Sequence, residues 1–117
     1  MTDWPPCIPD LLALVDDPGE RVWQSLRPGV DLLPLYGTGP HGPGAALLRY
    51  AAGAEVPAHE HQGYEQILVL AGSQSDHRGS YGPGTLVINP PGTRHAVHSV
   101  AGCVVLATWL GGIRVIP

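Results

Sequence analysis

Four residues have the types and spacing of a site for a metal ion. His59, His61 and Glu65 form the pattern H-x-H-x3-E, and His95 follows a Pro-x-Gly turn further along the chain. Side chains two residues apart in a strand point to the same face, so His59 and His61 can converge on one point. Residues 62–64 can form a turn that returns Glu65 on the next strand. The pattern therefore predicts a centre for one divalent ion.

The remaining histidines are expected to lie outside this site. His98 is three residues after His95 and should point to the opposite face of the same strand, so we take His95 as the ligand. His41 lies in GPHGPG and His77 in SDHRGS. Both segments are rich in turn-forming residues, which indicates exposed positions.

The predicted ligands allow several metals and several reactions. Imidazole binds Zn, Fe, Ni and Mn, and a carboxylate adds a hard anionic ligand, so the identity of the ion stays open. Three neutral imidazoles and one carboxylate reduce a +2 ion to a net +1, and six-coordination would leave up to two positions for substrate oxygens or O2. Iron would support oxidative C–C cleavage. Zinc would support Lewis-acid or activated-water chemistry, or ligand sensing without turnover.

Short strands must position these side chains. The chain has 117 residues, of which 44% are hydrophobic, and its 16 glycines and 13 prolines divide it into short segments. Strands are expected at 30–36, 45–51, 66–71, 85–88, 96–100, 103–110 and 113–116. Many short strands separated by Gly/Pro turns indicate an all-β sandwich or barrel, of which the jelly roll is one form.

The N-terminal segment is expected to differ from the rest. Residues 10–17 have the apolar spacing of a short helix, with Asp10 as N-cap, and Pro18-Gly19 should end it. We therefore divide the chain into an arm with a short helix at residues 1–20 and a β-barrel domain at residues 21–117. The arm would pack on the barrel or on a second subunit.

Composition excludes some partners. The formal net charge is −4, and the six basic residues are arginines scattered along the chain, which argues against nucleic acid as a partner. The longest apolar runs are too short to cross a membrane, and the N-terminus lacks the basic start of a signal peptide, so we expect a cytoplasmic protein that does not bind membranes. The two cysteines, Cys7 and Cys103, have no CxxC spacing, which argues against a thiolate zinc cluster.

The two ligand-bearing segments resemble the paired motifs of the cupin superfamily. They read Gly53-x5-His59-x-His61-x3-Glu65-x6-Gly72 and Gly84-x5-Pro90-x-Gly92-x2-His95-x3-Ser99. The resemblance implies a double-stranded β-helix barrel of RmlC-like type that holds one metal ion. The last position departs from the motif, because the family usually has Asn where this chain has Ser99. That position is not a ligand in the family, so the metal prediction is unaffected.

A narrower resemblance is to the cupin domain of ChrR-type anti-sigma factors and its stand-alone relatives. It covers about residues 21–110 and is carried by residues 28–30, 34–36, 46–50, 65–70 and 89–96. These relatives include zinc-binding sensor domains and dioxygenases that cleave small diketones or hydroxyketones. The first 20 residues are too few for the helical zinc-binding domain of ChrR, so we do not expect a sigma-factor partner. Cupins are commonly dimers, and a homodimer is expected by analogy.

Three functions therefore remain open. The first is a metal-dependent, dioxygenase-like enzyme that acts on a small oxygenated compound. The second is a zinc- and metabolite-sensing module without turnover, and the third is a metal-free structural cupin. Candidates for contact with a small-molecule ligand are Arg49, Tyr64, Gln66 and Trp109. We expect an apolar cavity wall from Tyr50, Leu68, Leu70, Val97 and Trp109. An error of one residue in strand register would reverse these assignments.

Overall fold

The computed structural model describes residues 7–37 and 39–117, which form one 3-10 helix and eleven strands. The helix is η1 (Leu12–Val15). The strands are β1 (Gln24–Arg27), β2 (Val30–Gly37), β3 (Gly44–Tyr50), β4 (Glu55–His61), β5 (Glu65–Gly72), β6 (Gln74–Asp76), β7 (Gly79–Tyr81), β8 (Leu86–Asn89), β9 (Arg94–His98), β10 (Cys103–Trp109) and β11 (Ile113–Val115). No helix in the described residues is long and apolar enough to cross a membrane.

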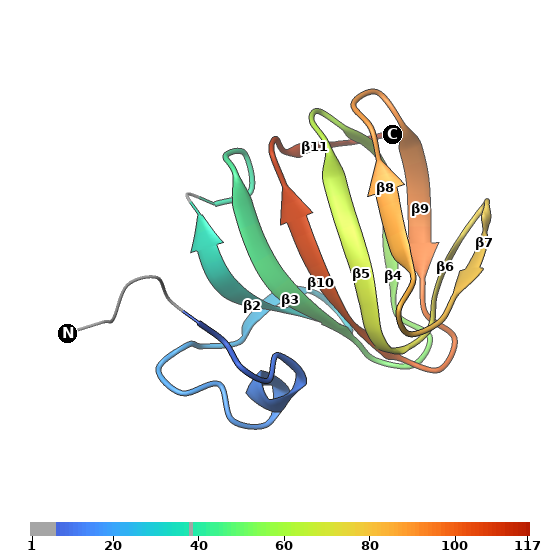
Figure 1. Cartoon of the computed structure of the whole chain (residues 1–117). Coiled ribbons are helices and arrows are strands. Elements are labelled where there is room, and N and C mark those ends of the chain that lie inside the picture. Colours follow the sequence, from blue (N-terminus) through green and yellow to red (C-terminus); the bar gives the residue numbers. More distant parts are fainter. Residues whose placement is uncertain (1–6, 38) are drawn as a thin grey trace.

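The strands form two antiparallel sheets. One has six strands in the order β1-β2-β3-β10-β5-β8, and the other has five in the order β11-β4-β9-β6-β7. Figure 1 shows β4 behind β5 and β8, with β9 to the right of β8, so that the two sheets face each other. The non-sequential strand order and the paired sheets confirm the predicted all-β jelly roll.

The sequence predicted the apolar strands better than the polar ones. β2, β5 and β10 lie within a residue or two of their expected positions, whereas β1, β6 and β7 were not expected. These three strands have three or four residues each and few apolar side chains, so their pairing depends on neighbouring strands. The expected helix is reduced to one 3-10 turn, in which Asp10 Oδ1 accepts a hydrogen bond from the Ala13 amide at 3.3 Å.

The core lies between the inner faces of the two sheets. Its buried members are Val30, Tyr50, Ile67, Val69, Val87, Val97, Cys103 and Val105. Tyr50 and Val97 are therefore inside, as expected. Leu68 and Leu70 were assigned to the same wall, and this was wrong: Ile67 and Val69 are the core members of β5. Alternation places Leu68 on the other face, and Leu70 lies at the register shift between β5 and β10 and is not a member of the core.

The outer face of the six-stranded sheet carries a row of leucines in cross-strand register. Leu33 pairs with Leu47, Leu47 with Leu106, Leu106 with Leu68, and Leu68 with Leu86. Leu33 and Leu47 are fully buried, whereas Leu86 at the other end is 49% exposed. Burial on this face therefore decreases from β2 towards β8.

The N-terminal segment is attached to this outer face. The Trp23 indole N–H donates to the Val15 carbonyl at 3.3 Å, and the Arg49 guanidinium lies 4.0 Å from the centre of the Trp23 ring. Arg49 also forms an ion pair with Asp31 at 3.0 Å. Figure 1 shows the segment with η1 beside the ends of β2 and β3. These contacts hold the segment against the six-stranded sheet of the same chain.

Ser99, which departs from the family motif, has a defined role after β9. It is fully buried, and its hydroxyl donates to the Ser73 carbonyl at 2.6 Å. Its backbone bonds to Gly53 and Ala54 at 2.7 and 3.0 Å. A serine hydroxyl therefore joins the end of β9 to the β5–β6 connection at this position.

Candidate metal centre

Three predicted ligands lie together on the five-stranded sheet. His59 and His61 are two residues apart on β4 and point inward, and His95 on β9 is the direct cross-strand partner of His59. One ring nitrogen from each histidine lies within 4.8 Å of the others. The three residues are 4%, 1% and 5% exposed. Three imidazoles are thus held close together with little access to solvent.

Glu65 approaches this cluster from the other sheet. It is the first residue of β5, and its Oε1 lies 3.2 Å from His61 Nε2. The turn at residues 62–64 places it there, and the Leu110 amide donates to the Tyr64 carbonyl at 3.0 Å. Gly63 lies so close to Gly111 that an added Cβ would be 2.9 Å from the Gly111 nitrogen. The predicted return of Glu65 on the next strand is confirmed.

The ring Nδ1 atom of each histidine is occupied by an acceptor. His59 Nδ1 lies 2.8 Å from the Pro57 carbonyl, and His61 Nδ1 lies 3.0 Å from the Thr93 carbonyl. His95 Nδ1 lies 3.0 Å from Asp76 Oδ2. These partners only accept, so in the neutral rings the proton is on Nδ1 and the lone pair is on Nε2. This is the tautomer that binds a metal through Nε2.

No hydrogen-bond donor of the described chain reaches the His95 Nε2 atom. His95 Nε2 is buried and has no hydrogen-bond partner among the described residues. His61 Nε2 faces a carboxylate oxygen of Glu65, so two lone pairs meet unless a proton or a cation lies between them. Buried polar atoms without partners cost folding free energy, of the order of 1–3 kcal/mol each. A divalent cation would accept the lone pairs of these atoms together, so the four side chains fit a metal ion as ligands.

Burial also favours the neutral form of the ligands. Desolvation lowers the pKa of His59 and of His95 below the ordinary histidine value, although the Pro57 carbonyl and Asp76, respectively, oppose the shift. Because an imidazole must be unprotonated at the nitrogen that binds a metal, a lowered pKa keeps these two rings available at neutral pH.

A second layer of side chains surrounds the four predicted ligands. Asp76, at the end of β6, is 2% exposed at its side chain and accepts hydrogen bonds from Arg78, Tyr81 and His95. Burial opposes its ionisation, but the bonds from Arg78, His95 and Tyr81 prevail and hold the pKa of Asp76 well below its usual range. Asp76 is therefore a carboxylate next to the histidine cluster.

No pattern in the sequence indicated these surrounding side chains. Asp76 and Arg78 lie in the segment SDHRGS, which we interpreted only as an exposed turn. His77 in that turn is indeed exposed, as are His41 and His98. Asn89 and Thr93 lie in the second motif but were given no role. The positions of Asp76 and Arg78 beside the site depend on the pairing of β6 with β9, and no spacing in the sequence indicates that pairing.

The four ligand-contact candidates occupy other positions. Arg49 is on the outer face of the six-stranded sheet and is paired with Asp31. Gln66 alternates with Glu65 on β5 and points to that same outer face. Tyr64 is 50% exposed in the turn next to Glu65. Trp109 is the cross-strand partner of both Glu65 and Gly44, and its indole N–H donates to the Gly39 carbonyl at 3.3 Å.

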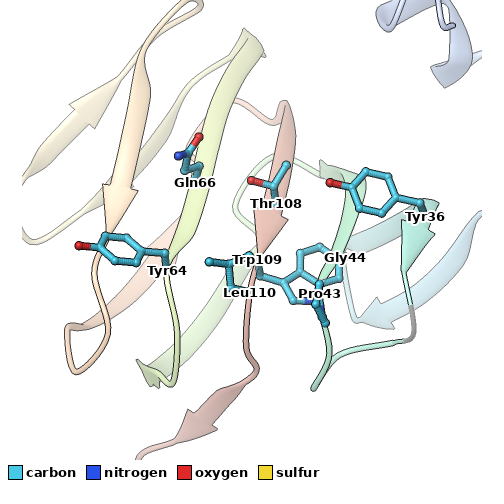
Figure 2. Close-up of a pocket in the computed structure, with 8 residues that line it drawn as sticks. All are labelled: Tyr36, Pro43, Gly44, Tyr64, Gln66, Thr108, Trp109 and Leu110. Carbon is cyan, nitrogen blue, oxygen red and sulfur yellow. The ribbon is translucent and has the colours of Figure 1, made fainter. Parts of the chain in front are cut away.

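A groove of about 230 Å³ lies near these residues but does not include the histidines. Its lining includes Tyr36, Tyr64, Gln66 and Trp109. Figure 2 shows Gln66 and Thr108 on neighbouring strands and Trp109 beside Gly44. A Cβ added at Gly44 would lie 2.6 Å from the Trp109 ring, so only glycine permits this packing. The groove and the histidine cluster are separate features, and we place the candidate chemistry at the cluster because the donor atoms are there.

Solved structures of similar shape include an RmlC-like cupin. An RmlC-like cupin protein from Ralstonia eutropha has 21% identity and a TM-score of 0.72, over 80% of this chain and 66% of that chain. A chain in the complex of SigE with the anti-sigma ChrR from Rhodobacter sphaeroides has 28% identity and a TM-score of 0.71, over 82% and 53%. An acetylacetone dioxygenase from Acinetobacter johnsonii has 17% identity and a TM-score of 0.69, over 76% and 64%.

These matches differ from the present chain in length and sequence. The alignments span between about half and two thirds of the three solved chains. No protein of curated function matches the sequence significantly. The model of the ChrR cupin-like domain family matches residues 13–111, which begins inside the segment that we expected to be an arm. With that match over most of its length, and with the jelly roll and the histidine cluster in place, the chain belongs to the ChrR cupin-like domain family.

Proposed function

We propose that the protein binds one divalent metal ion through His59, His61, Glu65 and His95 and acts as a metal-dependent, dioxygenase-like enzyme. Its substrate would be a small oxygenated compound such as a diketone or a hydroxyketone. The observation that carries the proposal is the meeting of three buried histidine rings with the Glu65 carboxylate, where His95 Nε2 has no hydrogen-bond partner among the described residues. The resemblance to an acetylacetone dioxygenase in fold is consistent with it.

Residues of this chain would bind the ion and fix the orientation of its ligands. The three imidazoles would bind as neutral ligands, with each Nδ1–H fixed by Pro57, Thr93 or Asp76. Glu65 would supply the anionic ligand. Iron would contribute redox chemistry with O2, and zinc only Lewis-acid chemistry, so the activity depends on which ion the protein holds.

The proposal is tested in two steps, first by elemental analysis and then by measuring oxygen uptake. Protein purified without chelators should contain about one transition-metal ion per chain. After removal of metal and anaerobic loading with Fe(II), it should consume O2 with at least one member of a panel of diketones, hydroxyketones and enols. His61→Ala should abolish the uptake. The absence of any bound metal would reject the site, and metal binding without oxygen uptake would reject the enzyme.

A zinc- and metabolite-sensing module is the second candidate. It is supported by the match at 28% identity in the SigE–ChrR complex and by the family assignment. In this case the zinc-loaded protein would bind members of the same panel without converting them. Calorimetry with product analysis separates the two functions, because a sensor would give a saturable binding isotherm and unchanged ligand.

The expected homodimer has one supporting feature. Leu86 and Ile88 on β8 are 49% and 48% exposed, and they continue the apolar outer face of the six-stranded sheet. We propose that a second copy covers this edge. Sedimentation should give a dimer for the wild type and a monomer for Leu86→Glu. A wild-type monomer at micromolar concentration would contradict the proposal.

A further inference from the structure

A continuous chain of polar contacts links two of the proposed ligands around the outside of the histidine cluster. From His95 Nδ1 it runs to Asp76 Oδ2 at 3.0 Å, and Arg78 Nη2 donates to the same oxygen at 2.7 Å. The same Arg78 nitrogen donates to Asn89 Oδ1 at 2.8 Å. Asn89 Nδ2 then donates to Glu65 Oε1 at 3.3 Å. His95 and Glu65 are therefore connected through three intermediate side chains.

This chain of contacts joins the two sheets. His95 and Asp76 belong to the five-stranded sheet, on β9 and β6, whereas Glu65 and Asn89 are cross-strand partners on β5 and β8 of the other sheet. Arg78, in the turn between β6 and β7, makes the connection between them. Among the described strands no backbone ladder joins the two sheets, so apart from the turn at residues 62–64, contacts between side chains set the distance between ligands that come from opposite layers.

The chemistry of each member suits this role. Asp76 is 2% and Asn89 1% exposed, so both are shielded from water. Arg78 contacts Asp76 through Nε, Nη2 and its backbone amide, which is a fork that a lysine could not reproduce. The Asn89 amide is oriented by its partners, since its oxygen faces Arg78 and its nitrogen faces Glu65.

We infer that Asp76, Arg78 and Asn89 form a positioning bridge that fixes the ring and tautomer of His95 and the carboxylate of Glu65 for one metal ion. The inference rests on the proposed metal site and adds residues that do not themselves bind the ion. Asp76 holds the proton of His95 on Nδ1, so that the Nε2 lone pair is directed to the site. Asn89 fixes Glu65 Oε1 through a hydrogen bond, and Arg78 connects Asp76 to Asn89.

Zinc affinity and histidine tautomers test the bridge. We would measure zinc binding by competition with a chromophoric chelator at pH 7.5, and the tautomers of metal-free protein by ¹⁵N NMR. Asp76→Asn should weaken zinc binding about 10–100-fold, the usual effect of losing an outer-shell partner. It should also move His95 from the Nδ1–H tautomer towards a mixture. Arg78→Lys, which keeps the charge but not the fork, should weaken binding in the same direction with a smaller tautomer change.

Asp31→Asn is the matched control. It removes a carboxylate from another arginine pair, Arg49–Asp31, on the outer face of the other sheet, and should leave zinc affinity and the His95 tautomer unchanged. A folded Asp76→Asn protein with wild-type zinc affinity and wild-type His95 tautomer would overturn the inference. If Asp76→Asn does not fold, the zinc affinity of Arg78→Lys and the ¹⁵N NMR spectrum of the wild type decide the question. An Nε2–H tautomer of His95 in the wild type would also overturn the inference.

The experiment separates this inference from the proposed function. If the wild type binds no zinc and no iron, the metal site fails, and the tautomer of His95 in wild type and Asp76→Asn still shows whether Asp76 positions the ring. If the wild type binds metal and the bridge variants bind it equally well, the site stands and the positioning bridge is rejected.

Discussion

The two faces of the six-stranded sheet carry different side chains although the same strands form both. On the inner face of β5 and β8, Glu65 and Asn89 point towards the histidines of the opposite sheet. On the outer face, the same two strands carry Leu68 and Leu86, which belong to the leucine row. Alternation along a strand thus separates a polar, buried site from an apolar packing surface by one residue.

Polar residues on the two faces of this sheet differ in whether they reach the histidine cluster. Glu65 and Gln66 are adjacent in the sequence, yet only Glu65 contacts the histidine cluster. Arg49 is a good anion-binding residue by type, but it lies on the outer face and is paired with Asp31. The face of a strand, and not the residue type, decides which polar side chains reach the site.

The largest effect is expected from His61 on the inner side of the sandwich. His61→Ala should lower metal affinity by more than the roughly 10–100-fold typical of an outer-shell change, because it removes a proposed ligand itself. The matched control is His98→Ala, an exposed histidine on β9 of the same sheet. Metal content after dialysis against a weak chelator measures the difference. Equal metal retention by both variants would contradict the assignment.

The second effect concerns stability on the outer face. Leu47 is fully buried in the middle of the leucine row, so Leu47→Ala should lower the free energy of unfolding by about 2–5 kcal/mol. Leu86→Ala, at the 49% exposed end of the same row, should cost much less. Urea unfolding of the metal-free proteins measures both. These values apply to a single subunit, so both variants are compared at a protein concentration that keeps the protein monomeric. A larger loss for Leu86 than for Leu47 under that condition would contradict the prediction, whereas a Leu86→Ala loss that grows with protein concentration would support the proposed dimer contact at the β8 edge.

A dependence of stability on pH is expected from the histidines on the inner side of the sandwich. Burial lowers the pKa of His59 and His95 in the folded state, whereas in the unfolded chain they regain the ordinary value of about 6.5. As pH falls below about 6.5 the unfolded chain takes up these protons first, so the metal-free protein loses stability; the loss levels off below the folded-state values. Urea unfolding at pH 7.5 and 5.5 measures it. The decrease should be smaller in a His59→Gln variant, and stability that rises towards pH 5.5 would refute the prediction.

The smallest effect is expected from Arg49. Its ion pair with Asp31 is more than a third exposed on both sides, and such pairs contribute about 0–1 kcal/mol. Arg49→Gln should therefore change stability little and leave metal affinity and any oxygen uptake unaffected. A marked loss of activity with normal metal content would instead place Arg49 in contact with substrate.

Much of the fold and the four-residue pattern could be predicted from the sequence. Strands such as β5 and β10 are continuous apolar segments bounded by turn-forming residues, and the H-x-H spacing puts His59 and His61 on one face of a strand. The turn at 62–64 and the Pro-x-Gly turn are local features, and Gly92 has a φ of +84° that glycine adopts readily. Local geometry was enough for these elements.

The sequence by itself determined the fold class, the family and the residues of the candidate site, because periodicity, turn chemistry and short motifs are properties of neighbouring residues. Only the tertiary structure decided which side chains surround that site. Asp76 and Arg78 reach the site because β6 pairs with β9 and because the two sheets lie close together. Leu68 lies outside the core because it is on the outer face of β5, whereas Ile67 is on the inner face. Such contacts join residues that are distant in the chain, and no local pattern encodes their distance or orientation.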